Sequence, residues 1–339
     1  MWRGILSTFI IALFWLPSPA FSAGKIKVGV VLDKGGRDDK SFNASAYLGA
    51  REAEKKLGIQ LKVVESSDDS AIEPSLRTFA QRGYDLVIGI GFVHAAPMKK
   101  VAAEFLKTHF LLVDADLRAP NVRSVTFNEH EGSYLVGAIA GLVTKSKVVG
   151  FVGGMDIPLI RRFELGYRAG AQSINADIKV LSNYVGATSD AWKNPMKGKE
   201  LALSQYHRKA DIVFVAAGAS GSGVFDAAEE MNRLAIGCDS NQNWIKPGKI
   251  LTSMLKRLDL AVFQAIELEQ QGKFQAGHFN LGLAEQGVDY ALDSYNRSLI
   301  TPDLEKKINE IKSKILSGRI KVPDYYQLSA TKNRPLSSE

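Results

Sequence analysis

Short apolar runs alternate along the chain with longer segments in which apolar residues recur at helical spacing. In the first part of the chain, strands are predicted at 26–32, 60–65, 86–90, 110–113 and 122–127, and helices at 42–57, 72–81, 95–107 and 129–144. Such alternation is typical of βαβ units, in which a parallel sheet is covered by helices on both faces. In the helix at 42–57 we expect Leu48 and Ala50 to face inward and residues 52–56 to face solvent.

The pattern starts again at Val148. The stretch V-V-G-F-V-G-G-M-D resembles the earlier V-G-V-V-L-D-K-G-G, and after it helices are predicted at 157–175, 195–209, 224–232 and 260–271, with strands at 180–185, 211–215, 234–239 and 249–255. An internal repeat of this kind predicts two lobes of similar topology. The length of 339 residues is also more than one hydrophobic core usually serves.

The lobe boundaries follow from this repeat. We predict a first lobe of residues 24–128 plus about 257–300 and a second of 129–256 plus about 301–325, so that the chain crosses between them near 127–130, 254–259 and 295–303. Two short strands are predicted within 277–292 and a helix at 302–317. We expect residues 326–339 to form a polar tail.

Residues 1–23 have the pattern of a secretory signal peptide. Arg3 precedes an apolar run at 5–16, and Pro17 and Pro19 precede the small-residue ending Ala20 to Ala23. This run is shorter than the roughly 20 apolar residues of a transmembrane helix. Because Cys238 is the one cysteine of the sequence, we expect neither a lipid anchor at the cleavage site nor an internal disulfide. The predicted location is the periplasm, with membrane contact only through a partner.

The charge pattern argues against nucleic-acid binding. The 43 Lys and Arg residues give a formal net charge of +7, but they are interspersed with 36 acidic residues and form no long basic block. Such mixing is typical of a solvated surface. We therefore expect no nucleic-acid partner.

The stretch D-K-G-G-R-D-D-K-S-F-N, residues 33–43, is the strongest candidate for chemistry. It joins a short apolar strand to a helix, and the carboxyl ends of strands are where open α/β sheets bind ligands. Phe42 offers a flat apolar face beside polar side chains, which suits a small molecule with a ring and hydroxyls. The alternative is an ordinary helix cap by Asp39 or Ser41 with Phe42 packed inward. Gly91 and Phe92, at the end of the third strand, form a second candidate rim.

Other chemistries have little support in the sequence. The glycine-rich turn at 218–223 has the spacing G-x-x-G-x-G, which matches neither a dinucleotide-binding loop nor a phosphate loop, and it contains no G-x-S-x-G nucleophile elbow. The five histidines have no metal-ligand spacing, and Cys238 lies in an apolar strand, which favours core packing. We expect no metal and no cofactor.

Asp33 and Asp239 also allow an enzymatic interpretation, because paired carboxylates serve in glycoside cleavage. They follow different strands, however, and the pattern places Phe42 and Trp192 nearby. Rings with carboxylates are typical of sites that stack a ring and capture hydroxyls. Binding without turnover is the better interpretation.

Several motifs together carry a family resemblance. They are D-K-G-G-R-D-D-K-S-F-N-A-S-A-Y-L-G, Y-L-V-G-A-I-A-G, G-G-M-D-I-P-L-I-R-R-F-E-L-G-Y-R-A-G, P-M-K-G-K-E-L-A, A-A-G-A-S-G-S-G-V, G-C-D-S-N-Q and L-T-S-M-L-K-R-L-D, in this order from about residue 26 to 292. In these stretches the chain resembles the basic membrane protein family of ABC-transporter solute-binding proteins, which includes purine nucleoside receptors. The resemblance implies a type I periplasmic binding fold, with two Rossmann-like lobes, a hinge and a central ligand cleft.

The resemblance also implies roles for individual residues. Phe42 matches the aromatic that stacks on the purine, and Trp192 stands where members commonly have an opposing Phe. Asp33 and Asn43 match positions that hydrogen-bond the base. The positions that hold the ribose hydroxyls correspond to Gly218, Asp239 and Lys256. With the rim residues Asp39, Gly91 and Phe92, these form the predicted ligand site.

The function implied by the resemblance is capture of a nucleoside such as guanosine, inosine or adenosine by a monomeric receptor, which delivers it to the permease and ATPase of an ABC transporter. The chain departs from the family pattern at Trp192, at Asn194 in place of Asp, and at Lys34 and Arg37, which leaves the exact nucleoside open. A sensor of the same family without transport, a receptor for another ring-bearing ligand, and an enzyme such as a nucleoside hydrolase are the alternatives.

Overall fold

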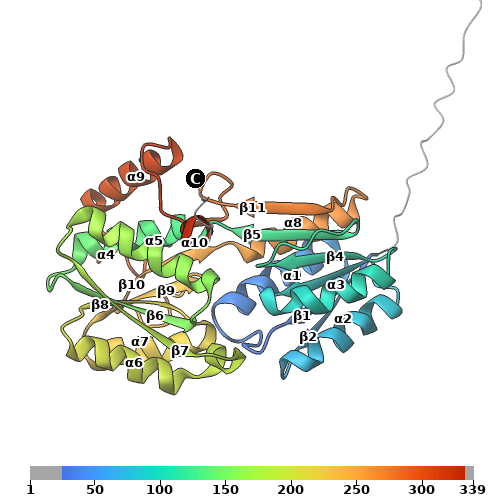
Figure 1. Ribbon diagram of the computed structural model, residues 1–339, viewed down its shortest axis with the longest axis horizontal. Coiled ribbons are helices and arrows are strands. Elements are labelled where there is room, and N and C mark those ends of the chain that lie inside the picture. Colours follow the sequence, from blue (N-terminus) through green and yellow to red (C-terminus); the bar gives the residue numbers. More distant parts are fainter. Residues whose placement is uncertain (1–24, 333–339) are drawn as a thin grey trace, which may run out of the picture.

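The computed structural model describes residues 25–332. The predicted signal peptide at 1–23 and residues 333–339 of the predicted tail lie outside this range. Within residues 25–332, no helix is long and apolar enough to cross a membrane. The chain forms two lobes that lie side by side, each a sheet between layers of helices (Figure 1).

The first lobe contains a six-stranded parallel sheet. Its order is β2-β1-β3-β4-β5-β11, with strands β1 (Lys27–Leu32), β2 (Gln60–Glu65), β3 (Leu86–Ile90), β4 (His109–Val113), β5 (Val122–Phe127) and β11 (Gly277–Leu281). Helices α1 (Phe42–Leu57) and α8 (Leu258–Gln270) pack together, as do α2 (Ile72–Gln81) and α3 (Ala95–Glu104). The inner strands β1, β3 and β4 are buried on both faces, which explains their nearly continuous apolar sequences, whereas the edge strands β2 and β11 are only partly buried.

The second lobe repeats this arrangement. Its order is β7-β6-β8-β9-β10-β12, with strands β6 (Val148–Met155), β7 (Lys179–Gly186), β8 (Ile212–Ala216), β9 (Leu234–Asp239), β10 (Ile250–Lys256) and β12 (Val288–Tyr290), and only β12 is antiparallel to its neighbour. Helix α4 (Glu129–Val143) packs on α5 (Pro158–Ile174), α6 (Pro195–His207) packs on α7 (Gly221–Glu230), and α9 (Pro302–Leu316) packs on α4. The internal repeat predicted from the sequence is confirmed by the matching strand orders.

Three chain crossings join the lobes, and the third differs from the prediction. The first two run from β5 to α4 and from β10 to α8, as expected. The third runs through residues 282–287, between β11 in the first sheet and β12 in the second, rather than near 295–303. The two short strands at 277–292 belong to different sheets, because β11 extends the first sheet beside β5 whereas β12 pairs with β10.

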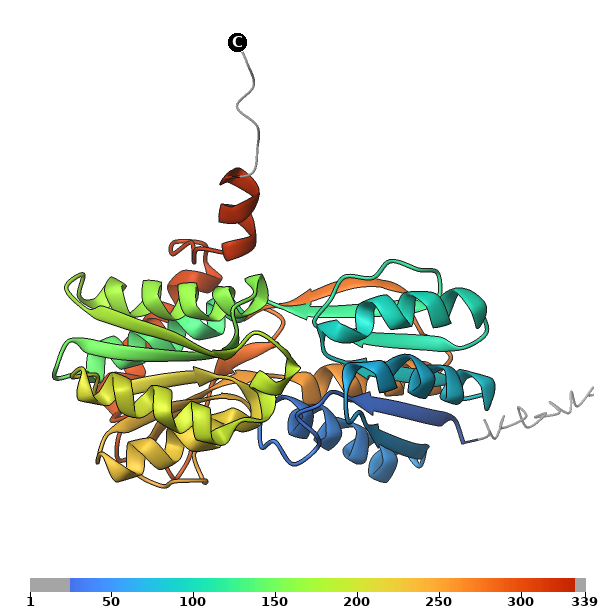
Figure 2. The same ribbon diagram turned by 60° about the horizontal axis from the view of Figure 1, so that its bottom comes forward.

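The C-terminal part of the described chain is helical where a polar tail was expected from residue 326. Helix α10 (Tyr325–Lys332) begins beside Asp324, whose Oδ1 accepts from the backbone N–H of Tyr326 at 3.1 Å. This helix projects from the body of the second lobe (Figure 2). Asp324 is in turn held by Arg162 of α5, a tertiary contact that the local sequence does not reveal.

The side-chain prediction for α1 is wrong at Leu48, which is 59% exposed, and at Ala53, which is buried although residues 52–56 were expected to face solvent. It is right at Ala50, which is buried. The buried face of α1 consists of small residues because α8 approaches it closely. A Cβ at Gly49 would lie 2.2 Å from the carbonyl oxygen of Asp259. Close helix packing therefore selects the small residues, and Leu48 is left on the outer side.

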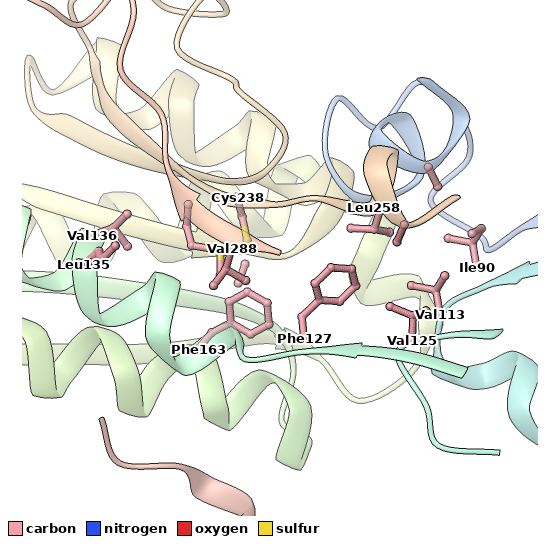
Figure 3. Packing of buried hydrophobic residues seen from close by; sticks show 14 of the residues in the cluster. Ile90, Val113, Val125, Phe127, Leu135, Val136, Phe163, Cys238, Leu258 and Val288 are labelled. Atoms are coloured by element: carbon pink, nitrogen blue, oxygen red, sulfur yellow. The ribbon is translucent and has the colours of Figure 1, made fainter. Parts of the chain in front are cut away.

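One buried apolar cluster continues through both lobes. Phe127, at the first crossing, lies between labelled side chains of the first lobe, such as Val113 and Leu258, and those of the second lobe, such as Phe163 and Cys238 (Figure 3). The crossings are thus packed into the core.

Candidate functional site

A cavity between the lobes brings together all ten residues of the predicted site. The space between its lining atoms is about 540 Å³, which includes the part that opens to solvent. Its lining contains the predicted residues Asp33, Asp39, Phe42, Asn43, Gly91, Phe92, Trp192, Gly218, Asp239 and Lys256. Six further residues, which the sequence interpretation missed, complete it: Asp114, Leu159, Ile160, Phe163, Ala216 and Cys238.

The cavity lies at the carboxyl ends of the strands in both sheets. In each lobe the strand order reverses between the first and third strands of the repeat, β1 and β3 or β6 and β8, and this reversal leaves a crevice at the sheet edge. Asp33 follows β1, Gly218 closely follows β8, and Asp239 and Lys256 end β9 and β10. The fold therefore aims polar groups from two sheets into one space.

Asp33 and Asn43 form a hydrogen-bonded pair on the first-lobe wall. Asn43 Nδ2 donates to Asp33 Oδ1 at 2.6 Å, and the backbone N–H of Gly35 donates to the same oxygen at 2.9 Å. Gly91 adopts a positive φ of 107°, and a Cβ there would lie 3.3 Å from Asp33 Oδ2. Burial raises the pKa of Asp33 to about 7, because the hydrogen bonds to Asn43 and Gly35 only partly offset the loss of water. Asp33 can thus carry or lack a proton near neutrality.

Asp39 lines the cavity, but its carboxylate is occupied by the start of α1. Oδ1 accepts from the backbone N–H groups of Ser41 and Ala44, and Oδ2 accepts from the backbone and side chain of Asn43, at 2.8 to 3.0 Å. The helix-cap alternative considered for this residue fits this geometry. Asp39 fixes α1, and thereby places Phe42 and Asn43.

Aromatic rings come to the cavity from both lobes. Phe42 is the first residue of α1, and Phe92 begins the short helix η2 (Phe92–His94). Trp192 lies in the short helix η3 (Ser189–Lys193) of the second lobe, and Phe163 lies on α5. Trp192 packs on Gly154 of β6, where a Cβ would lie 2.0 Å from its Cζ3, so this glycine makes room for the indole.

The glycine-rich turn after β8 supports η3. Ser220 Oγ donates to the carbonyl of Ala191 at 2.7 Å and accepts from the backbone N–H of Asn194 at 2.7 Å. Asn194 itself caps α6, since its Oδ1 accepts from the backbone N–H of Lys197 at 3.0 Å, and it is not among the lining residues. These bonds hold Trp192 in place.

Lys256 places a buried ammonium at the cavity. Its Nζ donates to Asp114 Oδ2 at 2.6 Å and lies 3.1 Å from Glu129 Oε1. The rings of Phe42, Phe127 and Phe163 surround Nζ with centroids at 5.1 to 5.6 Å. Burial disfavours the charged form, but the carboxylates of Asp114, Glu129 and Asp239 outweigh it and hold the pKa of Lys256 above its usual value.

Two carboxylates at equivalent strand ends flank Lys256. Asp114 follows β4 with a φ of 70°, and Asp239 ends β9 with a φ of 66°, a conformation that costs energy in residues other than glycine and is concentrated at functional sites. The ammonium pairs with Asp114, whereas Asp239 Oδ2 accepts from Ser41 Oγ at 2.5 Å. Burial raises the pKa of Asp239, and it raises that of Asp114 to about 6 against the opposing effect of Lys256.

Asp114 has a carboxylate oxygen without a hydrogen-bond partner among the described residues. Its Oδ1 is buried and receives no hydrogen bond among the described residues. A signal for this residue was present in the sequence, because L-L-V-D has the same apolar-strand-then-Asp pattern as V-V-L-D before Lys34 and G-C-D before Ser240. An unsatisfied buried acceptor is costly unless a ligand or water supplies the donor.

The lobes are joined on two sides of the cavity. On one side, Ser240 Oγ donates to the carbonyl of Ser41 at 2.8 Å and Gln242 Nε2 to that of Lys40 at 2.9 Å. On another, Lys34 forms an ion pair with Asp190, and Ser189 Oγ donates to Asp69 Oδ2 at 2.8 Å. The lobes therefore enclose the cavity in a closed arrangement.

The two cations that depart from the family pattern both have acidic partners. Lys34 pairs with Asp190, and Arg37 Nε lies 3.0 Å from Glu65 Oε1. Lys256 is buried and already paired with Asp114. The cavity wall thus combines rings, carboxylates and one compensated ammonium, which suits a neutral ligand with a ring and hydroxyl groups better than an anion.

Comparison with known proteins agrees with the fold and the motifs. The chain matches the family model Bmp, described as ABC transporter substrate-binding protein PnrA-like, over residues 26–325. The ABC transporter nucleoside-binding protein BmpA of Lactococcus lactis is 34% identical over 321 residues, which cover 88% of this chain and 89% of the relative. An uncharacterized lipoprotein of Pyrococcus abyssi is 34% identical over 284 residues, which cover 79% of this chain and 69% of the relative. The crystal structure of an ABC transporter solute-binding protein from Aeropyrum pernix K1 superposes with a TM-score of 0.81 at 30% identity, covering 90% of this chain and 96% of that one.

Proposed function

Because this chain belongs to the Bmp family of PnrA-like ABC transporter substrate-binding proteins, we propose that it captures a purine nucleoside between its lobes and delivers it to an ABC transporter. The observation that carries the proposal is the cavity, in which rings from both lobes lie beside carboxylates and an ammonium at the strand ends. The nucleoside-binding relative from Lactococcus lactis supports the ligand class.

In this proposal the base lies between the rings of Phe42 and Trp192. Stacking on one aromatic contributes roughly 1–3 kcal/mol per base, so two rings supply a large part of a micromolar affinity of about −8 kcal/mol. Asp33 accepts hydrogen bonds from ring N–H groups, and Asn43, whose amide is held by Asp39 and Asp33, fixes the orientation of that carboxylate. Gly91 and Phe92 complete the first-lobe wall.

The ribose is proposed to lie against the second lobe. Asp239 accepts from the ribose hydroxyls, Lys256 donates to their oxygens, and Gly218 leaves room for the sugar beside Trp192. The unpartnered Oδ1 of Asp114 is a further acceptor for a hydroxyl. A ligand without these hydroxyls leaves buried polar groups unpaired, which is why such sites reject deoxy analogues strongly.

The proposal includes the location and the partners of the protein. The predicted signal peptide at 1–23 directs it out of the cytoplasm. There the protein acts as a monomer, and its closed, ligand-bound form presents the nucleoside to the permease. The transporter's ATPase drives uptake through that permease. Closure around the ligand is a hinge motion about the three crossings.

Mass spectrometry of the bound ligand tests this function directly. Protein purified without denaturation is washed, denatured and filtered, and the filtrate is analysed for small molecules. We expect a purine nucleoside in near-stoichiometric amount from the wild type and much less from Trp192→Ala. A different class of molecule, released stoichiometrically from the wild type, would refute the proposal.

A further inference from the structure

A chain of buried charges runs from the ligand cavity to the C-terminal segment. Its members alternate in sign: Asp114, Lys256, Glu129, Arg162 and Asp324. Each contacts the next, with separations of 2.6, 3.1, 2.5 and 2.8 Å between the paired atoms. None of these five side chains is more than 11% exposed. Such a network is strong only while every member keeps its partner.

On the side of the network away from the cavity, Arg162 makes most of the contacts. Its Nη1 donates to Glu129 Oε2 at 2.5 Å and to the carbonyl of Phe127 at 2.7 Å, and its Nη2 donates to His130 Nδ1 at 3.0 Å. Burial and the guanidinium lower the pKa of His130 to about 4, so its ring is neutral and can accept. Asp324 takes the remaining edge through Nε at 2.8 Å and Nη2 at 3.2 Å. All five N–H groups of the guanidinium are therefore used.

This network ties two of the three interlobe crossings together. Phe127 and Glu129 lie at the crossing from β5 to α4, and Lys256 is the last residue of β10, at the crossing to α8. Glu129 contacts Lys256 through one oxygen and Arg162 through the other. The position of the ammonium in the cavity thus depends on a carboxylate that Arg162 holds.

The outer end of this charge network is Asp324, which belongs to the C-terminal segment, residues 324–332. Asp324 binds Arg162 through both oxygens, and the ring of Tyr326 covers the guanidinium with its centroid 4.7 Å from Cζ. Tyr326 lies just beyond residue 325, where the family match ends. The segment is thus docked on the hinge by one buried cation, and helix α10 stands away from the rest of the lobe (Figure 2).

We propose that Glu129, Arg162 and Asp324 are positioning residues for Lys256, and that docking of the C-terminal segment is thereby coupled to ligand binding. Loss of Asp324 frees one edge of Arg162, which then competes more strongly for Glu129 and weakens the hold of Glu129 on Lys256. By thermodynamic reciprocity, a ligand that fixes Lys256 also favours the docked segment. The ligand arm of this inference rests on the proposed function, whereas the coupling between Lys256 and residues 324–332 does not.

The first experiment needs no ligand. Hydrogen exchange of residues 324–332, followed by mass spectrometry, is compared in the wild type, Lys256→Gln and the control Lys246→Gln, which removes a partly exposed lysine of the same lobe. We expect at least about fivefold faster exchange of this segment in Lys256→Gln and no change in the control, in line with the usual size of coupling between sites. If Lys256→Gln unfolds, Asp114→Asn, which removes the partner of the ammonium, replaces it. Unchanged exchange in a folded variant would overturn the inference.

The second experiment measures guanosine affinity by calorimetry in Asp324→Asn and in the control Glu305→Gln, which removes a partly exposed ion-pair partner. We expect a loss of at least about fivefold in Asp324→Asn, none in the control, and partial recovery when Arg162→Lys is compared with Arg162→Met. Wild-type affinity in Asp324→Asn would overturn the ligand arm. Failure of the wild type itself to bind guanosine would count against the proposed function alone, and the exchange experiment would still decide the coupling.

Discussion

Under the proposed function, the protonation state of Asp33 should make nucleoside binding dependent on pH in a calculable way. Burial raises its pKa to about 7, and the proposed contact to the base uses the carboxylate as an acceptor for ring N–H groups of guanosine or inosine. Binding then requires the ionised form, so affinity rises with pH through about 7 and levels off above it.

The size of the effect follows from the ionised fraction. With a pKa of about 7, the fraction is about nine tenths at pH 8 and about 3% at pH 5.5, which predicts a roughly 30-fold weaker affinity at the lower pH. Asp39 and Asp114 are the charged neighbours that raise the pKa of Asp33. Asp114, with a pKa of about 6, begins to titrate only in the lower half of this range.

Calorimetry from pH 5.5 to 8 checks this prediction, with Asp33→Asn as the control. The variant should bind more weakly at pH 8 and lose most of the dependence between pH 6.5 and 8. Adenosine, whose ring N1 is an acceptor, should instead favour the protonated acid. A guanosine affinity that stays constant between pH 6.5 and 8 in the wild type would refute the assignment of Asp33 to the base.

Three further predictions concern the rings, the ribose and the mouth of the cavity. Phe42→Ala and Trp192→Ala should each weaken nucleoside binding at least about tenfold, because stacking contributes roughly 1–3 kcal/mol per base; calorimetry that finds wild-type affinity in both would eliminate the ring sandwich. Asp239→Ala should abolish the preference for guanosine over guanine, and a preference that survives in competition assays would remove Asp239 from the ribose site. Lys34→Glu and Asp190→Lys should each speed nucleoside release a few-fold, as expected for a pair whose aspartate is largely exposed; stopped-flow release should return toward wild type in the double swap, and additive single effects would argue against an interlobe contact.

The polar residues at strand ends were the predictable part of the site. Asp33, Gly91 and Asp239 were identified because a buried strand that ends in a small or acidic residue marks the rim of a parallel sheet. The same rule fits Asp114, which the sequence interpretation passed over although it follows β4 in the same way. The role of Asp39 could not be predicted from the sequence. Whether a carboxylate faces a ligand or caps a helix depends on which backbone N–H groups reach it.

Long-range pairing was the unpredictable part of the fold. The third crossing lies at 282–287 because β11 and β12 join different sheets, and nothing in either short strand specifies its neighbour. Helix α10 follows Asp324, which binds Arg162, a residue far away in the sequence. Likewise, the sequence does not reveal that Lys256 pairs with Asp114, which the chain brings to the same place from the other lobe.

A competition series on ligand-free protein tests the central claim most directly. Guanosine, 2′,3′-dideoxyguanosine, guanine and GMP are titrated by calorimetry into protein that has been unfolded, dialysed and refolded. We predict one saturable site for guanosine, with much weaker binding of the dideoxy compound and of guanine, which leave Asp239 and Lys256 without hydroxyl partners, and weak binding of GMP, which adds negative charge beside Asp239. Equal affinities for guanosine and its dideoxy analogue, or tighter binding of GMP, would contradict the account of this protein as a nucleoside receptor.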